Sequence, residues 1–370
     1  MENVLYENTT RQYYDYSFLL DAIDYKINMI HSFTISSLRK LPVWIFELLT
    51  SAKSFKDNPI IGSPLLNRLG LHVVRLVLSH GIMRARMWML AISVDAEDRK
   101  SFFDNGYIVK ENFLSEADFA ALEKEARVFK GEVREARQGD TLTHRAALSP
   151  EVLQNYPAIK KLFSNKYFNR LTRFTSGHFR EPLFYLEEVK NQYCQGVADP
   201  QKTFHDDTFH PSMKCWLFID DVDESLGPFT FVPGSHKLSW KRLKWHYRMS
   251  IKAKDAPNHL HARGSTRFSE ADLKELCLPD AHAFTVKKNT LVLVNVFGIH
   301  RRGDSTEKST RLAIWGDSRT NPFIPFPGVG GKFVNELQYY FLDLYRKKID
   351  ENAKKKGMRS PWRVIGHDEK

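Results

Sequence analysis

The chain has little cysteine. Its 370 residues include only three cysteines, Cys194, Cys215 and Cys277. The number is odd and none of them lies in a C-x-x-C pair, so neither a disulfide framework nor a structural zinc site is indicated. The cysteine content therefore predicts a reducing compartment.

Long apolar runs are also missing. No uncharged stretch reaches the roughly 20 residues that a membrane-spanning helix needs. Residues 1–7 show neither the basic nor the apolar region of a signal peptide. We therefore expect a cytoplasmic protein, and a peripheral position at the inner face of the membrane stays open.

Acidic residues are outnumbered by basic ones. The chain has 55 lysines and arginines against 44 acidic residues, a formal net charge of +11. This surplus favours anionic partners, which include nucleic acid, an acidic membrane surface and a phosphorylated or carboxylated small molecule. The hydrophobic fraction of 42% is enough for a packed core and excludes wholesale disorder.

Three regions differ in composition. Residues 1–98 are typical of a helical extension, residues 99–325 of a catalytic domain, and residues 326–370 of a helix followed by a basic tail. In the extension, the segment 64–90 carries two rows of residues at helical spacing. The apolar row is Leu65, Leu66, Leu69, Val73, Leu76 and Val77, and the opposing polar row is Arg68, His72, Arg75, Ser79 and Arg86.

This segment has two interpretations. A helix with arginines on one face and apolar side chains on the other can lie in a membrane interface. Alternatively, its apolar face packs on the main domain and its arginines lie in water.

After residue 182 the sequence is rich in short strands without regular helices between them. This pattern excludes a doubly wound parallel sheet and predicts an antiparallel sandwich or barrel. Upstream, helices are expected over 115–128, with Ser115 as the N-cap, and over 150–175. The expected strands are 183–194, 214–222, 228–232, 283–286, 290–297 and 311–317.

Two histidines and one carboxylate form a candidate metal site. In an extended segment, residues two apart share a face, so His205 and Asp207 point the same way and Asp206 points away. His300 follows a later apolar run and can supply the third ligand. This set, with coordination positions left open, is the ligand set of non-haem Fe(II) oxygenases. An H-x-D tripeptide alone also arises by chance in a chain with 14 histidines.

Arg311 lies eleven residues after His300. A guanidinium there can bind the far carboxylate of a dicarboxylate cosubstrate that chelates the metal through its other end. The alternative is a surface arginine at the head of a strand.

These residues, with Trp216–Val222 and Gly227–His236, resemble the phytanoyl-CoA dioxygenase family over residues 100–320 or so. The resemblance implies a mainly β fold with flanking helices and a double-stranded β-helix (jelly roll, cupin-like) core. It also implies a dioxygenase that uses Fe(II), 2-oxoglutarate and O₂ to hydroxylate a C–H bond.

The resemblance further assigns site residues. His205, Asp207 and His300 match the iron ligands, Arg311 matches the clamp on the 2-oxoglutarate carboxylate, and Trp216 and Gln192 fall on strands that line the cosubstrate pocket. One departure is that Arg301 and Arg302 follow His300 where many members have a small hydroxyl residue. Ser309 can serve instead.

Residues 237–254 read as a basic and aromatic excursion from the sheet. Lys241, Arg242 and Trp245 are the candidates for substrate binding, by charge and by stacking. The alternative is a solvated surface loop. Together with the segment 64–90, the excursion suggests a peripheral membrane enzyme that hydroxylates an anionic, amphiphilic or lipid-linked small molecule.

Two other functions stay open. A nucleic-acid modifying oxygenase would use the same basic and aromatic residues, but no nucleic-acid module is recognisable, so nucleic acid is not expected as a partner. A non-catalytic binding protein on the jelly-roll scaffold is disfavoured because all four positions of the iron and cosubstrate site are filled.

Overall fold

The computed structural model describes residues 35–196 and 199–366. The chain divides into two compact units, Met1–Glu47 and Leu48–Lys370. The described part of the first unit is helix α2 (Ile35–Glu47), which contains Pro42. The part of the predicted extension before residue 35 lies outside the described residues. The predicted boundaries at residues 98 and 325 stay predictions, and all further elements belong to the second unit.

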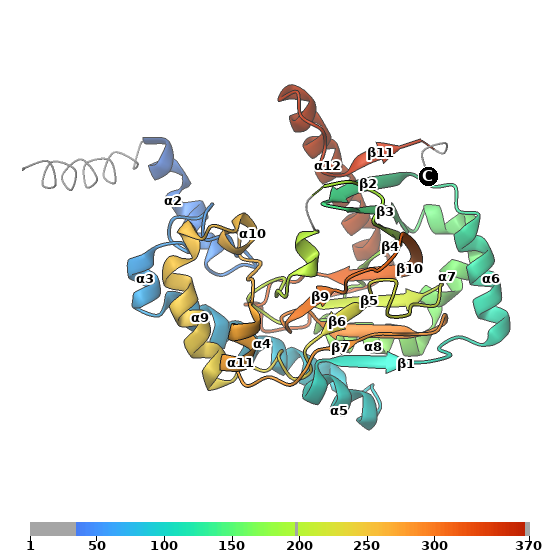
Figure 1. Ribbon diagram of the computed structural model, residues 1–370, viewed down its shortest axis with the longest axis horizontal. Coiled ribbons are helices and arrows are strands. Elements are labelled where there is room, and N and C mark those ends of the chain that lie inside the picture. The colour runs from blue at the N-terminus through green and yellow to red at the C-terminus, as the bar shows by residue number, and fades with distance from the viewer. Residues whose placement is uncertain (1–34, 197–198, 367–370) are drawn as a thin grey trace, which may run out of the picture. The chain divides into compact units, whose positions relative to one another are not determined.

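Two antiparallel sheets form the body of the second unit (Figure 1). The strand order is β1-β8-β5-β10-β4-β3-β2-β11 in the large sheet and β7-β6-β9 in the small one. Phe218 of β5, Val292 of β8 and Phe229 of β6 share one buried cluster, so the two sheets pack face to face. This confirms the predicted jelly-roll class, with sheets that do not close into a barrel.

The strands are short, and their bounds are β1 (Tyr107–Lys110), β2 (Val133–Gln138), β3 (Thr141–Ala147), β4 (Leu183–Asn191), β5 (Met213–Phe218), β6 (Phe229–Phe231), β7 (His282–Ala283), β8 (Leu291–Asn295), β9 (His300–Arg302), β10 (Ser309–Ser318) and β11 (Arg363–Ile365).

Helices cover the other face of the large sheet. The alternating residues Met213, Cys215 and Leu217 of β5 point to this side, where they join the largest buried cluster together with side chains of α4, α6, α7 and α8. The helices are α3 (Pro64–Arg68), α4 (Leu71–Ala91), α5 (Ala96–Asn105), α6 (Glu116–Arg127), α7 (Pro157–Ser164), α8 (Lys166–Ser176), α9 (Trp240–Lys252), α10 (His259–Ala262), α11 (Glu270–Glu275) and α12 (Lys332–Lys355), with 3₁₀ turns at Val152–Asn155, Pro200–Lys202 and Ala253–Asp255.

The structure adds strands that the sequence did not indicate, among them β2 and β3. β2 and β3 lie where no strand was expected, because β2, for example, reads Val-Arg-Glu-Ala-Arg-Gln and lacks an alternating apolar pattern. Charged side chains on these strands instead pair with opposite charges on a neighbouring strand. Arg145 of β3 lies opposite Glu187 of β4, and its Nε donates to the Glu187 carboxylate over 2.6 Å.

Helix α4 does not follow the interpretation in which its arginines lie in water. Arg75 and Arg86 are buried, whereas Val77 is exposed. The Arg75 guanidinium donates to the backbone carbonyls of residues 48, 50 and 52 over 2.7–3.1 Å. Arg86 donates to the Gly177 carbonyl over 2.7 Å and to the Asn321 carbonyl over 3.0 Å. The expectation that these arginines lie in water is therefore wrong, because they satisfy carbonyls of neighbouring loops.

The predicted excursion at 237–254 is helix α9 rather than a loop. The Ser239 hydroxyl caps it by accepting a hydrogen bond from the Arg242 amide. The helix packs against both α3 and α4 (Figure 1).

Arg242 of α9 is the centre of a buried polar network. Its guanidinium donates to the carboxylate of Asp206 and to the backbone carbonyls of Ser235 and Phe297, each over 3.0 Å. Burial raises the pKa of Asp206, against the pull of the Arg242 cation, and burial lowers the pKa of Arg242. Burial thus favours the neutral form of both side chains. The pair therefore contributes more to fixing the positions of the segments that it joins than to the free energy of folding.

We expect Arg242→Met to lower the free energy of unfolding by about 3–5 kcal/mol, because it leaves the Asp206 carboxylate buried without its cation. Urea unfolding followed by circular dichroism measures this change. The matched control is Lys241→Met on the exposed side of the same helix. This variant should stay within about 0.5 kcal/mol of the wild type. Equal effects of the two substitutions would contradict the structural role of Arg242.

Candidate metal centre and pocket

Backbone pairing places the two candidate histidine ligands side by side. His205 and His300 form an antiparallel bridge in which each backbone N–H donates to the other's carbonyl over 2.9 Å. Their ring centroids are 4.4 Å apart. Asp207 follows two residues after His205, and its own N–H donates to the Val296 carbonyl over 3.1 Å. Two segments almost 100 residues apart are thus held in one short piece of sheet-like pairing.

The three side chains converge on one point. His205 Nε2 lies 3.7 Å from Asp207 Oδ1, and His300 Nε2 lies 3.7 Å from Asp207 Oδ2. The three candidate ligand atoms lie within 4.8 Å of one another. Among the residues that the structure describes, this is the one such cluster of three or more His, Cys, Asp or Glu side chains.

The outer nitrogens of both imidazoles are engaged. The Nδ1 of His205 lies 2.7 Å from the Thr203 carbonyl, and the Nδ1 of His300 lies 2.8 Å from the Gly298 carbonyl. A carbonyl accepts only from N–H, so each Nδ1 carries the proton and each Nε2 keeps its lone pair for the shared point. Burial lowers the pKa of His300 to about 4 and that of His205 well below its usual value. Both rings are therefore neutral at pH 7, the form that binds a metal ion.

The candidate carboxylate ligand is held by two lysines. Burial acts to raise the pKa of Asp207, but the Lys214 cation and the two imidazoles outweigh it, so the pKa lies well below its usual range. Lys214 forms an ion pair with Asp207 Oδ2, and the Lys53 ammonium donates to the Asp207 backbone carbonyl. Asp206, expected to point away from the metal face, does so, and is the buried partner of Arg242.

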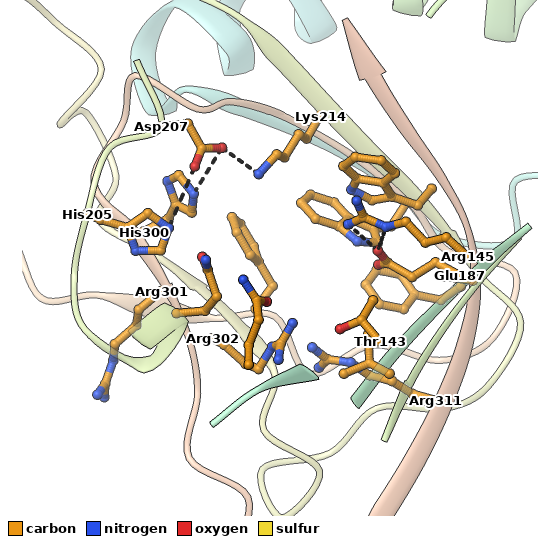
Figure 2. A pocket seen from close by; sticks show the side chains of 18 of the residues that line it. Thr143, Arg145, Glu187, His205, Asp207, Lys214, His300, Arg301, Arg302 and Arg311 are labelled. Atoms are coloured by element: carbon orange, nitrogen blue, oxygen red, sulfur yellow. Dashed lines mark hydrogen bonds and ion pairs between the residues drawn. The ribbon is translucent and has the colours of Figure 1, made fainter. Parts of the chain in front are cut away.

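A cavity of about 270 Å³ opens beside this cluster, between the two sheets (Figure 2). Its lining includes residues of β2, β3, β4, β5 and β10 of the large sheet and of β6 and β9 of the small one. The cationic members of the lining are Arg145, Lys214, Arg301, Arg302, Arg311 and Arg319, and the indole rings are those of Trp216, Trp315 and Trp362.

Arg311 lies across the cavity from the three candidate ligands (Figure 2). Its Nη1 donates to the Gly227 carbonyl over 2.5 Å, and among the described residues it forms no ion pair with a carboxylate. Burial, together with the nearby Arg302 cation, lowers the pKa of Arg311 to about 10, so it stays protonated at neutral pH. A cation is thus available to an anionic molecule inside the cavity.

The other predicted cosubstrate residues divide into two groups. Trp216 of β5 lines the cavity, as expected. Gln192 is exposed at the end of β4 and donates to the Ser305 carbonyl over 2.5 Å. Ser309 is buried at the start of β10, where its hydroxyl accepts from Asn191 over 3.1 Å. Neither Gln192 nor Ser309 is part of the described lining, and their roles stay predictions.

The three predicted substrate residues lie outside the cavity lining. Lys241 is exposed, with its Nζ 2.7 Å from Cys277 Sγ. Arg242 is buried in the network around Asp206. Trp245 is buried too, and its indole N–H donates to Asp272 over 2.7 Å. The structure thus gives two of the three a role in packing α9, and contact of all three with a substrate stays a prediction.

Sequence reasoning missed several lining residues that strand periodicity could have found. Since Trp216 and Arg311 were expected to face inward, the residues two or four positions away on β5 and β10 share that face. These are Lys214, Phe218, Ala313 and Trp315, and all four line the cavity.

Other lining residues gave no such signal. Arg145 stands on the unpredicted β3, with its guanidinium carbon 3.6 Å from the centroid of the Trp315 ring. Trp362 comes from the C-terminal tail next to β11, and the Arg134 guanidinium donates to its backbone carbonyl over 3.2 Å.

Solved structures similar to this chain are distant in sequence. The epimerase SnoN in complex with Fe3+, alpha ketoglutarate and nogalamycin RO is 18% identical, with a TM-score of 0.41, covering 64% of this chain and 91% of that chain. HygX from Streptomyces hygroscopicus with nickel and 2-oxoglutarate bound is 16% identical, with a TM-score of 0.39, covering 60% and 87%. EctD from S. alaskensis with bound Fe is 17% identical, with a TM-score of 0.37, covering 61% and 76%. No curated protein sequence matches the chain.

A family model gives the assignment. Residues 102–275 match the model described as phytanoyl-CoA dioxygenase, a range that includes His205 and Asp207 and ends before His300 and Arg311. The match confirms the predicted enzyme class, an oxygenase dependent on Fe(II) and 2-oxoglutarate, and the His-Asp-His cluster suits that metal. Over residues 102–275, the predicted resemblance to the phytanoyl-CoA dioxygenase family is therefore confirmed.

Proposed function

We propose that His205, Asp207 and His300 hold the iron of a hydroxylase that acts on an anionic, amphiphilic or lipid-linked small molecule. The observation that carries the proposal is the convergence of two imidazole Nε2 atoms and one carboxylate within 4.8 Å. Iron bound there, with 2-oxoglutarate and O₂, supplies the oxidising power that hydroxylation of an unactivated C–H bond requires.

The protein's own contribution begins with ligand orientation. The Thr203 and Gly298 carbonyls fix the Nδ1 tautomers, so neither imidazole has to turn or lose a proton when a metal binds. Lys214 offsets the charge of Asp207 and holds one of its oxygens, which favours binding of a metal through the other.

Arg311 is the proposed partner of the far carboxylate of 2-oxoglutarate. It faces the three ligands across the cavity and keeps its charge without a carboxylate partner among the described residues (Figure 2). Trp216, on the adjacent strand β5, supplies an apolar part of the cavity wall for the carbon chain between the two ends of 2-oxoglutarate. Both features fit a five-carbon dicarboxylate that bridges metal and arginine.

Two features of the cavity support an anionic, amphiphilic substrate. Its lining includes six basic residues, of which Arg301 points its guanidinium away from the cavity (Figure 2), against two acidic ones, Glu187 and Asp207. Several of the cations have carboxylate partners, such as Arg302 with Asp199. A guanidinium has five N–H donors, so one carboxylate partner does not use them all. The indoles of Trp315 and Trp362 add apolar surface to the cavity lining.

We also propose that the enzyme works at a membrane surface, through the predicted segment 64–90. No helix in residues 35–196 and 199–366 has both the length and the apolar character needed to span a bilayer. The support for a peripheral contact is the row of exposed apolar side chains on α4, which includes Val77 and Trp88.

We expect Asp207→Ala to weaken Fe(II) binding by about 100-fold or more, because losing a ligand should cost at least as much as losing an outer-shell partner. Anaerobic isothermal titration calorimetry with Fe(II) measures the affinity. Asp304→Ala, an exposed carboxylate near the β9 end, is the control and should bind as the wild type does. Fe(II) binding by wild type and Asp207→Ala with equal affinity would rule out the proposed centre.

Arg311→Met should raise the KM for 2-oxoglutarate by about 30-fold or more, since truncating one partner of a buried charge pair typically costs about 2–5 kcal/mol. Succinate formation measures this, and Fe(II) affinity should stay unchanged. The control is Arg301→Met, whose guanidinium points away from the cavity (Figure 2). A larger effect at Arg301 than at Arg311 would place the cosubstrate carboxylate elsewhere. Absence of both succinate formation and Fe(II) binding in the wild type would favour a non-catalytic binding protein.

A further inference from the structure

The outer face of α4 is apolar along nearly its whole length. Six side chains spaced by three, four or their sums form what we call the α4 stripe, and each is between 47% and 87% exposed. Gly81 and Ala85 continue the same row and are exposed as well. The α4 stripe consists of Val74, Val77, Leu78, Trp88, Met89 and, just past the helix end, Ile92.

The orientation of the helix is fixed by its inner face. Arg75 and Arg86 together donate to the backbone carbonyls of residues 48, 50, 52, 177 and 321. Turning α4 to bury the stripe would break these bonds and leave buried carbonyls without donors, at a cost for each group. The apolar stripe is therefore held outward by polar contacts beneath it, and the exposure is a property of the fold.

The segment that carries the stripe is basic. Residues 58–94 contain four arginines and no aspartate or glutamate. Two of these arginines, Arg68 and Arg84, are exposed. Helix α9, which packs against α3 and α4, adds a second exposed row at helical spacing, composed of Lys241, Lys244, Arg248 and Lys252.

We propose that the α4 stripe docks flat on an anionic lipid bilayer, with Arg68, Arg84 and the α9 cations contacting the headgroups. The proposal rests on the membrane contact proposed above and assigns it a face and a lipid charge. Apolar side chains can enter the acyl boundary while adjacent lysines and arginines attract acidic lipids.

A second copy of the chain fits this face less well. From Val74 to Ile92 the stripe is about 27 Å long at 1.5 Å per residue. With a width of about 10 Å, it offers far less than the roughly 800 Å² per partner of a stable protein interface. Two copies would also bring like charges together at Arg84. A bilayer needs no such minimum contact area, and it does not bring a second copy of Arg84 close to the first.

Vesicle sedimentation of the full chain tests the proposal. We expect the protein to sediment with vesicles of equal parts phosphatidylcholine and phosphatidylglycerol, and less with phosphatidylcholine alone. The double variant Val77→Glu, Trp88→Glu should lose about tenfold or more in partitioning, since it removes apolar contacts and adds charges that acidic lipids repel. Added salt should weaken wild-type binding, as screening of the cations requires.

The control places the same change on another exposed apolar face. Phe341 and Tyr345 of α12 are 58% and 63% exposed, so Phe341→Glu, Tyr345→Glu matches the stripe variant in chemistry and exposure. This control should sediment as the wild type does. Thermal unfolding followed by circular dichroism should show that both double variants stay folded.

Three results would overturn the proposal. One is wild-type protein that stays in the supernatant with acidic vesicles, and another is loss of binding in the α12 variant alone. The third is a dimer in sedimentation velocity without lipid that the stripe variant abolishes.

Failure here is separable from failure of the proposed chemistry. The stripe lies outside the metal centre and cavity lining, so Fe(II) affinity and succinate formation in lipid-free solution should be equal in wild type and stripe variant. A stripe variant that also fails to bind Fe(II) would overturn the separation of the two surfaces.

Discussion

The buried pair of Arg242 and Asp206 is the contact on which the geometry of the candidate metal centre depends. Asp206 stands between the two ligands His205 and Asp207, and Arg242 also holds the carbonyl of Phe297, three residues before His300. One guanidinium thus ties both ligand segments to helix α9. The shifts of both pKa values towards the neutral form indicate that burial costs more than the attraction contributes, so the pair acts through position. Asp206 therefore does not face the metal, but through Arg242 it fixes the position of the segments that carry the ligands.

The cavity draws on parts of the chain far from the segment that matches the family. Lys53 donates to the backbone of Asp207 from the segment before the matched range, and Trp362 lines the cavity from the tail after it. Oxygenases of one family share the metal chemistry, while the walls of the cavity select the substrate. Trp362 and the Arg145–Trp315 stack therefore make β3 and the C-terminal segment part of the cavity wall.

Helix α4 buries two arginines and exposes a row of apolar side chains, the reverse of the usual arrangement. An arginine has five N–H donors, which makes it suited to the free carbonyls that loops leave inside a protein. Once Arg75 and Arg86 take this role, the apolar residues on the opposite side of α4 have no core to enter. The sequence pattern alone does not say which face of α4 is buried. The contacts of the inner face decide it, through the carbonyls bound by Arg75 and Arg86 and through the packing of Met83 and Met87 in the core.

The sequence by itself determined the chemistry of the site and the class of the fold. Period-two spacing put His205 and Asp207 on one face, and short strands without intervening helices indicated the antiparallel sheets. It did not indicate β2 and β3, because their strand character comes from pairing with a neighbour, as in Arg145 opposite Glu187. It also could not place Arg242, Lys53 or Trp362, nor orient α4. Those outcomes depend on contacts between residues far apart in the chain, where burial and unsatisfied hydrogen-bonding groups decide the arrangement, and local patterns carry no record of them.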